Sequence, residues 1–121
     1  MDDDVAEYTV HSAFCMGKKE ESSKHLPKCR IHVDGKKVIA IIDTGASINI
    51  MAEGHYKTLA RPQPLQKARV RVYAYGQKQP LTLVGMFEAN ITHENNRVES
   101  KIYFAEDGQG MLLSGKTAEA L

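Results

Sequence analysis

The sequence has no tryptophan and only two cysteines, which are too few for a disulfide framework. Cys15 and Cys29 could form a single bridge. The acidic Met1–Asp4 segment has no apolar run after it, so we expect no secretory signal, reduced thiols and a cytoplasmic location. No apolar run approaches the roughly 20 residues that cross a bilayer, so we expect no membrane partner.

Neither sign of charge dominates the chain, since 16 Lys and Arg face 15 Asp and Glu, for a net charge of +1. Charge alone therefore does not favour nucleic acid as a partner. The length of 121 residues fits one domain and excludes a two-lobed enzyme built from duplicated halves.

A zinc site is suggested only weakly by the closeness of Cys15, His25 and Cys29 in the sequence. Structural zinc sites have four ligands and usually a tight Cys-x-x-Cys pair, which is missing here, so we expect no metal and no cofactor. The histidines are scattered and suggest no Ser-His or Cys-His arrangement: His11, His25, His32, His55 and His93.

The sequence predicts two regions. Residues 1–27 form a polar N-terminal extension, partly disordered, because residues 16–24 have no apolar period. Within it, Glu7–Val10 is a short possible strand. We expect this extension to be dispensable for folding, and residues 28–121 to form the domain.

The domain has the short alternating runs and frequent turns of an all-β protein. Gly85 interrupts a long alternating run at Leu81–Ile91 and predicts a bulge there. A helical turn is expected over Met51–Leu59, and another helix after Ser114. The pattern predicts a closed or nearly closed barrel with one or two short helices. The other expected strands are 29–33, 36–42, 69–75, 98–105 and 111–113, the first two joined by a turn at Asp34-Gly35.

The segment with chemical content is the apolar run Val38–Ile42 followed by Asp43-Thr44-Gly45-Ala46-Ser47. A carboxylate at the end of a buried strand is costly unless it is hydrogen-bonded or has a functional task. Gly45 lets the chain turn sharply and brings backbone N–H groups near the acid. Alternatively, Asp43 only holds a turn in an unrelated small barrel.

These residues resemble a retropepsin, a retroviral-type aspartic protease, and are most similar to the protease domains of gypsy-type retrotransposon polyproteins. Ile41–Ser47 resembles the catalytic loop, the hairpin around Tyr75–Pro80 resembles the flap, and Leu112–Gly115 resembles an element near the family's C-terminus. Ser114 departs from the usual Gly, and Gly115 from the Arg of many members. The sequence ends at Leu121, before the C-terminal strand that many members use in dimerisation.

The resemblance implies a homodimeric aspartic endopeptidase that processes a polyprotein substrate inside the cell, including within a retroelement particle. Two copies of Asp43 would activate water, Thr44 would bond across the dimer axis, and Gly45 would lie near the substrate. The flap, roughly Val72 to Leu81, would close over an extended peptide. The implied substrate-binding residues are Ala46, Ser47, Tyr75, Gly76 and Gln77, and the candidate subsite walls are Ala46, Ile48, Val84 and Ile91.

The other acids of the matched region lie in turns or polar stretches, so the second aspartate is expected from a second copy of the chain. A different interpretation is a catalytically weak or inactive retropepsin-like module for dimerisation or peptide binding. The intact Asp43-Thr44-Gly45 triplet argues against it, whereas Ser114 and the early end argue for it.

Overall fold

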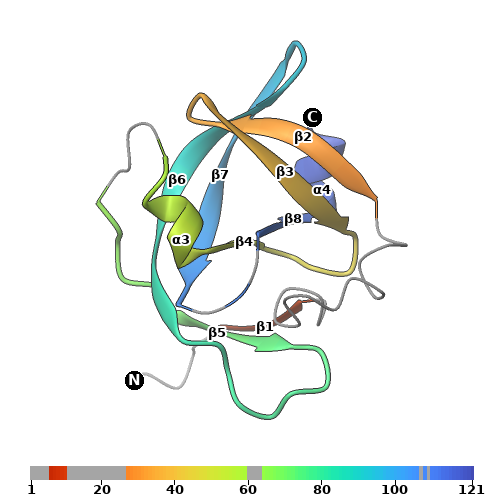
Figure 1. The fold of residues 1–121 in the computed structure, drawn as a ribbon. Coiled ribbons are helices and arrows are strands. Elements are labelled where there is room, and N and C mark those ends of the chain that lie inside the picture. The colour runs from red at the N-terminus through yellow and green to blue at the C-terminus, as the bar shows by residue number, and fades with distance from the viewer. Residues whose placement is uncertain (1–5, 11–26, 60–63, 107, 109) are drawn as a thin grey trace.

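The computed structural model describes residues 6–10, 27–59, 64–106, 108 and 110–121. Six strands close into a barrel in the order β2-β3-β8-β4-β7-β6, and a separate two-stranded sheet of β1 and β5 lies beside it (Figure 1). The expected all-β barrel is therefore confirmed. The elements are β1 Ala6–Val10, β2 Lys28–Val33, β3 Lys36–Asp43, β4 Asn49–Ala52, α3 Glu53–Tyr56, β5 Val70–Ala74, β6 Leu83–His93, β7 Asn96–Ala105, β8 Met111–Ser114 and α4 Gly115–Glu119.

The first hairpin forms where the sequence predicts it. Asp34 and Gly35 both have positive φ, 48° and 91°, as a two-residue turn between twisted strands requires. Val33 pairs with Lys36 across this turn. The alternation along β2 buries Ile31 and Val33 inside the barrel and leaves the intervening polar side chain exposed.

The part of the barrel beneath Asp43 is built by strands that are distant in sequence. β3 runs parallel to β8, so that Asp43 pairs with Ser114. β8 is antiparallel to β4, which is itself parallel to β7. The helical turn expected over Met51–Leu59 is present as α3, but it begins later than expected, at Glu53, because Met51 lies on β4. All residues of β4 are buried, so the strand has no apolar-polar alternation by which to recognise it.

Part of the barrel wall is apolar on both faces. Its inner face packs around Phe87 and Phe104, whose rings stack with centroids 5.2 Å apart, while Tyr56 of α3 meets Phe104 edge-on. The outer face forms a second cluster, called here the outer cluster. Its buried members are Val10, Ala46, Ile48, Ile50, Ala52, Val72, Met86, Tyr103, Ala105 and Leu112.

The outer cluster is covered by the β1–β5 sheet. β1 pairs in parallel with β5 over its whole length, from Ala6–Val70 to Val10–Ala74. The strand expected at Glu7–Val10 is therefore present, although residues 1–5 and 11–26 of the predicted extension lie outside the described residues. The division of the chain at residue 27 stays a prediction.

The β5–β6 connection forms a hairpin that projects beyond the barrel (Figure 1). The N–H of Leu81 donates to the carbonyl of Val72 over 2.7 Å, and the N–H of Gln77 donates to the carbonyl of Ala74 over 2.9 Å. From Leu83 onward, however, β6 pairs with β7 and not with β5. The edge of β5 therefore pairs with β1.

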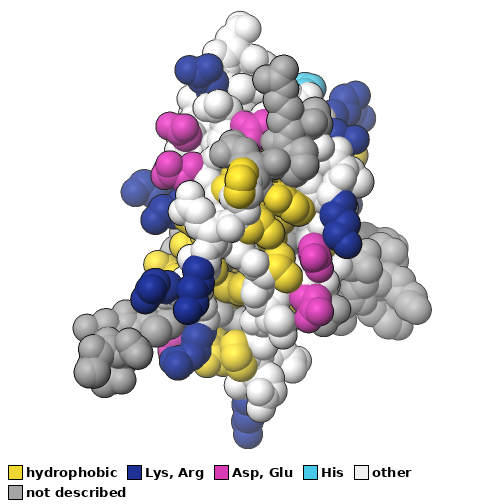
Figure 2. All heavy atoms as spheres, turned by 90° about the vertical axis from the view of Figure 1, so that its left-hand side faces the viewer, with side chains coloured by type: hydrophobic (Ala, Val, Ile, Leu, Met, Phe, Trp, Pro, Cys, Tyr) yellow, Lys and Arg dark blue, Asp and Glu magenta, His cyan; other side chains and the backbone are white. Residues whose placement is uncertain are grey.

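The described surface mixes charges of both signs. On the face that carries α3, Lys and Arg side chains alternate with Asp and Glu around a band of hydrophobic atoms (Figure 2). This distribution matches the near-zero net charge and produces no field of one sign on that face. In the part of the chain that the structure describes, no helix has the length and apolar character needed to span a bilayer.

Gly85 is the predicted bulge, since the β6–β7 register shifts between Leu83 and Gly85. Its φ is +153°, and a Cβ built on it would lie 2.7 Å from the Cβ of Leu65 and 2.9 Å from the carbonyl oxygen of Gln66. Both the backbone conformation and the space therefore require glycine.

We expect Gly85→Ala to lower the free energy of unfolding by about 2 kcal/mol or more, because it adds strain and a backbone clash together. Gly54→Ala is the matched control, since a Cβ at Gly54 meets nothing within 4 Å. Urea unfolding of both variants measures the difference. Equal stability of the two variants would contradict this account of the bulge.

Candidate active site

Asp43 ends β3 and is 9% exposed. The N–H of Gly45 donates to its carboxylate Oδ1 over 3.1 Å, and the N–H of Ala46 donates to its backbone carbonyl over 3.0 Å. These bonds fold the chain into a tight turn directly after the strand. The carboxylate is thereby held by the backbone of the Asp43–Ala46 loop, as the sequence motif predicts.

The start of α4 packs closely against this loop. A Cβ on Gly115 would lie 3.0 Å from the Cα of Thr44 and 3.3 Å from its carbonyl oxygen. The absence of a side chain at Gly115 therefore allows two backbone segments to approach closely. Gly115 differs from the Arg found in many retropepsins, and here its contact with Thr44 gives it a structural role.

A buried amide joins the strands beneath the loop. Asn49 of β4 accepts a hydrogen bond from the N–H of Ser114 over 2.9 Å. Its amide nitrogen donates to the hydroxyl of Ser100 over 3.0 Å and to the carbonyl of Lys101 over 2.9 Å. Asn49 is 2% exposed and thus connects β4, β7 and β8 away from water. No sequence motif identified it.

Ser114 extends this network into α4. Its hydroxyl accepts from the N–H of Thr117 over 3.1 Å, which caps the helix, and donates to the Thr117 hydroxyl over 2.9 Å. Ser114 is paired with Asp43 in the β3–β8 ladder, so the helix cap and the carboxylate are neighbours in the same sheet. Ser114, which departs from the predicted family pattern, therefore fits the structure with its hydroxyl hydrogen-bonded.

We expect Asn49→Ala to lower the free energy of unfolding by about 2–4 kcal/mol, because it removes the partner of the buried Ser114 N–H and of the part-buried Lys101 carbonyl. Asn95→Ala, on the exposed β6–β7 turn, is the control and should change stability little. Thermal and urea unfolding compare the two variants. A loss no larger than that of the control would show that water replaces the amide.

A cavity of about 400 Å³ lies beside Asp43 and is lined by Asp43, Gly45 and Tyr75. Thr9 and Val10 of β1 complete its walls. The structure thus brings the predicted catalytic loop and one predicted flap residue to the same space. Tyr75 is 75% exposed, so it has freedom to move over the opening.

Of the remaining predicted site residues, some are buried and others are exposed to solvent. Ala46 and Ile48 are buried in the outer cluster, whereas Ser47 is exposed and lines a second cavity. Gly76, with φ of 85°, and Gln77 lie on the exposed hairpin tip and do not line the Asp43 cavity.

Two of the candidate subsite walls were wrong. Ile91 is fully buried in the barrel core, and Val84 packs against that same core. Thr9 and Val10, which line the Asp43 cavity, were not among the predicted site residues.

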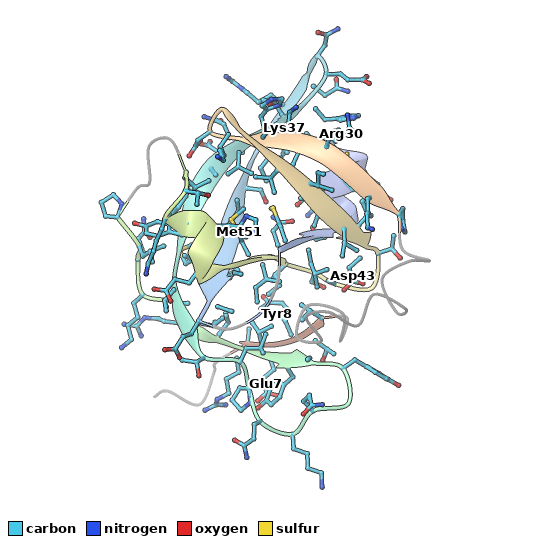
Figure 3. The ribbon with its side chains drawn as sticks, in the orientation of Figure 1. Glu7, Tyr8, Arg30, Lys37, Asp43 and Met51 are labelled. Carbon is cyan, nitrogen blue, oxygen red and sulfur yellow. The ribbon has the colours of Figure 1, made fainter. Side chains whose placement is uncertain are left out.

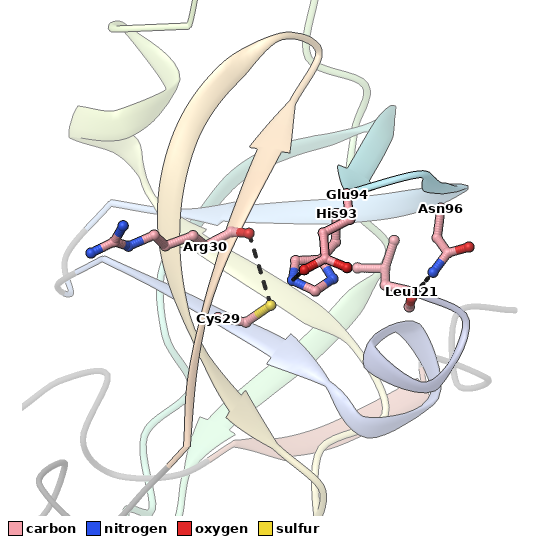
Figure 4. Close-up of polar contacts among 6 residues, drawn as sticks. All are labelled: Cys29, Arg30, His93, Glu94, Asn96 and Leu121. Carbon is pink, nitrogen blue, oxygen red and sulfur yellow. Dashed lines mark hydrogen bonds and ion pairs between the residues drawn. The ribbon is translucent and has the colours of Figure 1, made fainter.

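Cys29 was considered above as a disulfide partner and as a zinc ligand. Burial, and secondarily the charge of Glu94, raise the pKa of its thiol, so the thiol stays protonated and is a poor nucleophile. Its Sγ lies 3.9 Å from the Arg30 carbonyl (Figure 4). In the same view, the side-chain amide of Asn96 donates a hydrogen bond to the carbonyl of Leu121. Among the described residues, no group of three or more His, Cys, Asp or Glu could hold a metal ion.

Comparison with known proteins supports the fold. No protein family and no curated protein matches the sequence. A solved structure similar to this chain is the EIAV protease complexed with the inhibitor HBY-793, with a TM-score of 0.68 and 14% sequence identity. The alignment covers 79% of this chain and 88% of that chain. At this identity the likeness concerns the fold.

The chain therefore has a retropepsin-like all-β fold, that of a retroviral aspartic protease. The barrel places Asp43 at the end of β3, beside a cavity that Tyr75 of the β5–β6 hairpin also lines.

Proposed function

We propose that this protein is an aspartic endopeptidase that acts as a homodimer. The observation that carries the proposal is the placement of Asp43: in a retropepsin-like barrel, it lines a cavity that Tyr75 of the proposed flap also lines. A peptide entering that cavity would lie between a carboxylate and a hairpin able to cover it.

The chemistry needs two carboxylates that share one proton around a water molecule. The ionised carboxylate takes a proton from the water as its oxygen attacks the peptide carbonyl carbon. The protonated carboxyl then supplies a proton as the C–N bond breaks and the amine leaves.

One chain offers only half of this pair. Among the described residues, Asp43 is the one buried carboxylate. A twofold axis beside the exposed Thr44 and Gly45 would bring Asp43 of a second copy against the first, and Thr44 would then bond across the axis. The proposed dimer is thus a requirement of the chemistry.

The proposed substrate is an extended peptide segment, because β5 pairs with an extended strand, β1, that borders the cavity of Asp43. By its resemblance to gypsy-type retrotransposon proteases, we propose that this substrate is a polyprotein processed inside the cell. Ala46, Ser47 and Tyr75 would line the path of the peptide, with Gly76 and Gln77 supplying the mobile tip of the flap.

We expect Asp43→Asn to abolish cleavage of a pooled peptide library at acidic and near-neutral pH, because an amide cannot act as the base. Glu119→Gln makes the same chemical change on exposed α4 and should leave cleavage intact. Pepstatin should inhibit the unmodified chain. Cleavage by Asp43→Asn at the normal rate would refute the catalytic assignment.

Mixing the unmodified chain with an equal amount of Asp43→Asn tests the shared site. Random pairing leaves about one quarter of dimers with two aspartates, so activity per total dimer should fall to about one quarter instead of about one half. Activity is assayed at a fixed total protein concentration, with Glu119→Gln as the mixing control. A fall to one half would mean that each copy works alone.

The second candidate is a peptide-binding module with weak or no catalytic activity. It is favoured by the edge of β5, which pairs with an extended strand in the structure. Under this alternative, the unmodified chain binds peptides and cuts none, and Asp43→Asn binds them equally well.

A further inference from the structure

β1 lies between β5 and the Asp43 loop (Figure 3). Val10 is 2% exposed and packs in the outer cluster with Ala46 and Ile48, the residues that follow the catalytic triplet. Its carbonyl accepts a hydrogen bond from the N–H of Tyr75 over 2.8 Å. Val10 thus contacts both the segment that follows the catalytic triplet and the flap.

β1 also borders the two cavities on this side of the barrel. Thr9 and Val10 wall the cavity of Asp43, and Tyr8 walls a second cavity of about 420 Å³ that Ser47 and Lys116 also line. Tyr8 lies near Tyr103, whose pKa is raised by burial and further by Tyr8. Withdrawal of β1 would remove part of the wall of both cavities.

Successive side chains of β1 face opposite sides, as in any β-strand. Tyr8 and Val10 face the barrel, whereas Glu7 lies on the opposite side (Figure 3). Glu7 approaches Arg71 at 3.4 Å, but both side chains are more than half exposed, so the pair contributes little. Backbone pairing with β5 and burial of alternate side chains hold β1 in place.

We propose that β1 is an intramolecular ligand of the peptide groove: it occupies the space beside Asp43 that an external peptide must enter. The proposal rests on the proposed function for what happens to a bound peptide, but the occupancy itself does not require cleavage. The groove then selects an extended chain, parallel to β5, with apolar or aromatic side chains at alternate positions.

A tethered occupant competes at a high effective concentration, since it belongs to the same chain. The apparent affinity for an external peptide is reduced by the fraction of molecules in which the groove is open. Release of β1 therefore increases peptide binding without any change in the groove itself.

The test measures binding in full-length chains that carry Asp43→Asn, so that no peptide is cut. The probe is a fluorescent synthetic peptide with the sequence of residues 4–12. Adding Val10→Asp places a carboxylate at a buried position and should expel β1, tightening the apparent Kd of the probe by about tenfold or more. Ala6→Asp adds the same charge at an exposed position of β1 and should leave the Kd unchanged.

Equal probe affinity for all three chains, or no binding by a folded Val10→Asp chain, would overturn the proposal. A measurement without that substitution covers the case in which Val10→Asp does not fold. In the ¹⁵N-labelled Asp43→Asn chain, saturating unlabelled peptide should move the amide signals of Ala6–Val10 to random-coil positions while those of β7 stay. Unmoved β1 signals at saturation would equally overturn it.

These outcomes are independent of the proposed activity. If the unmodified chain cuts no peptide but the probe displaces β1, the endopeptidase proposal fails and the groove assignment stands. If the chain cuts peptides but Val10→Asp and Ala6→Asp bind the probe alike, the activity stands and the occupancy of the groove by β1 is refuted.

Discussion

The buried amide of Asn49 is the interaction on which the arrangement of the site depends. It bonds to β7 through Ser100 and Lys101 and to β8 through Ser114, so three strands meet at one side chain. Because Ser114 pairs with Asp43 and caps α4, the same bonds also locate the carboxylate and the helix start. A polar group in an apolar wall is stable only when all its bonds are made, which ties the strands to one register.

The wall of the barrel is unusual in having no polar face near the site. Residues of one parity fill the barrel, and those of the other parity form the outer cluster. The outer cluster needs a cover, and the β1–β5 sheet supplies it. The apolar surface that would receive a peptide is therefore the same surface that an uncovered barrel would expose to water.

Features set by neighbouring residues could be predicted from the sequence. The Asp34-Gly35 hairpin depends on its own turn, the bulge on Gly85, and the acid at the end of a strand on the run before Asp43. Features that depend on distant partners could not. Asn49 resembles a loop residue until Ser100 and Ser114 are beside it, and β4 is buried on both faces.

The subsite residues illustrate the same limit. Alternation shows that Leu112 and Leu113 face opposite sides of a strand, but not which side is the barrel interior. The choice is made by the parallel pairing of β8 with β3. Ile91 was misplaced for this reason, since its alternating pattern is equally compatible with either face.

The parallel β3–β8 pairing also sets when the site can exist. Asn49 and Ser114 are 65 positions apart, and all of β5, β6 and β7 lie between them. Such long-range closure is slow, and on the ribosome it must wait until β8 has emerged. The Asp43 loop is synthesised before the strands that support it. A chain still being synthesised therefore contains the carboxylate but lacks the strands that position it. Strand order thereby delays completion of the Asp43 site until β8 has been synthesised.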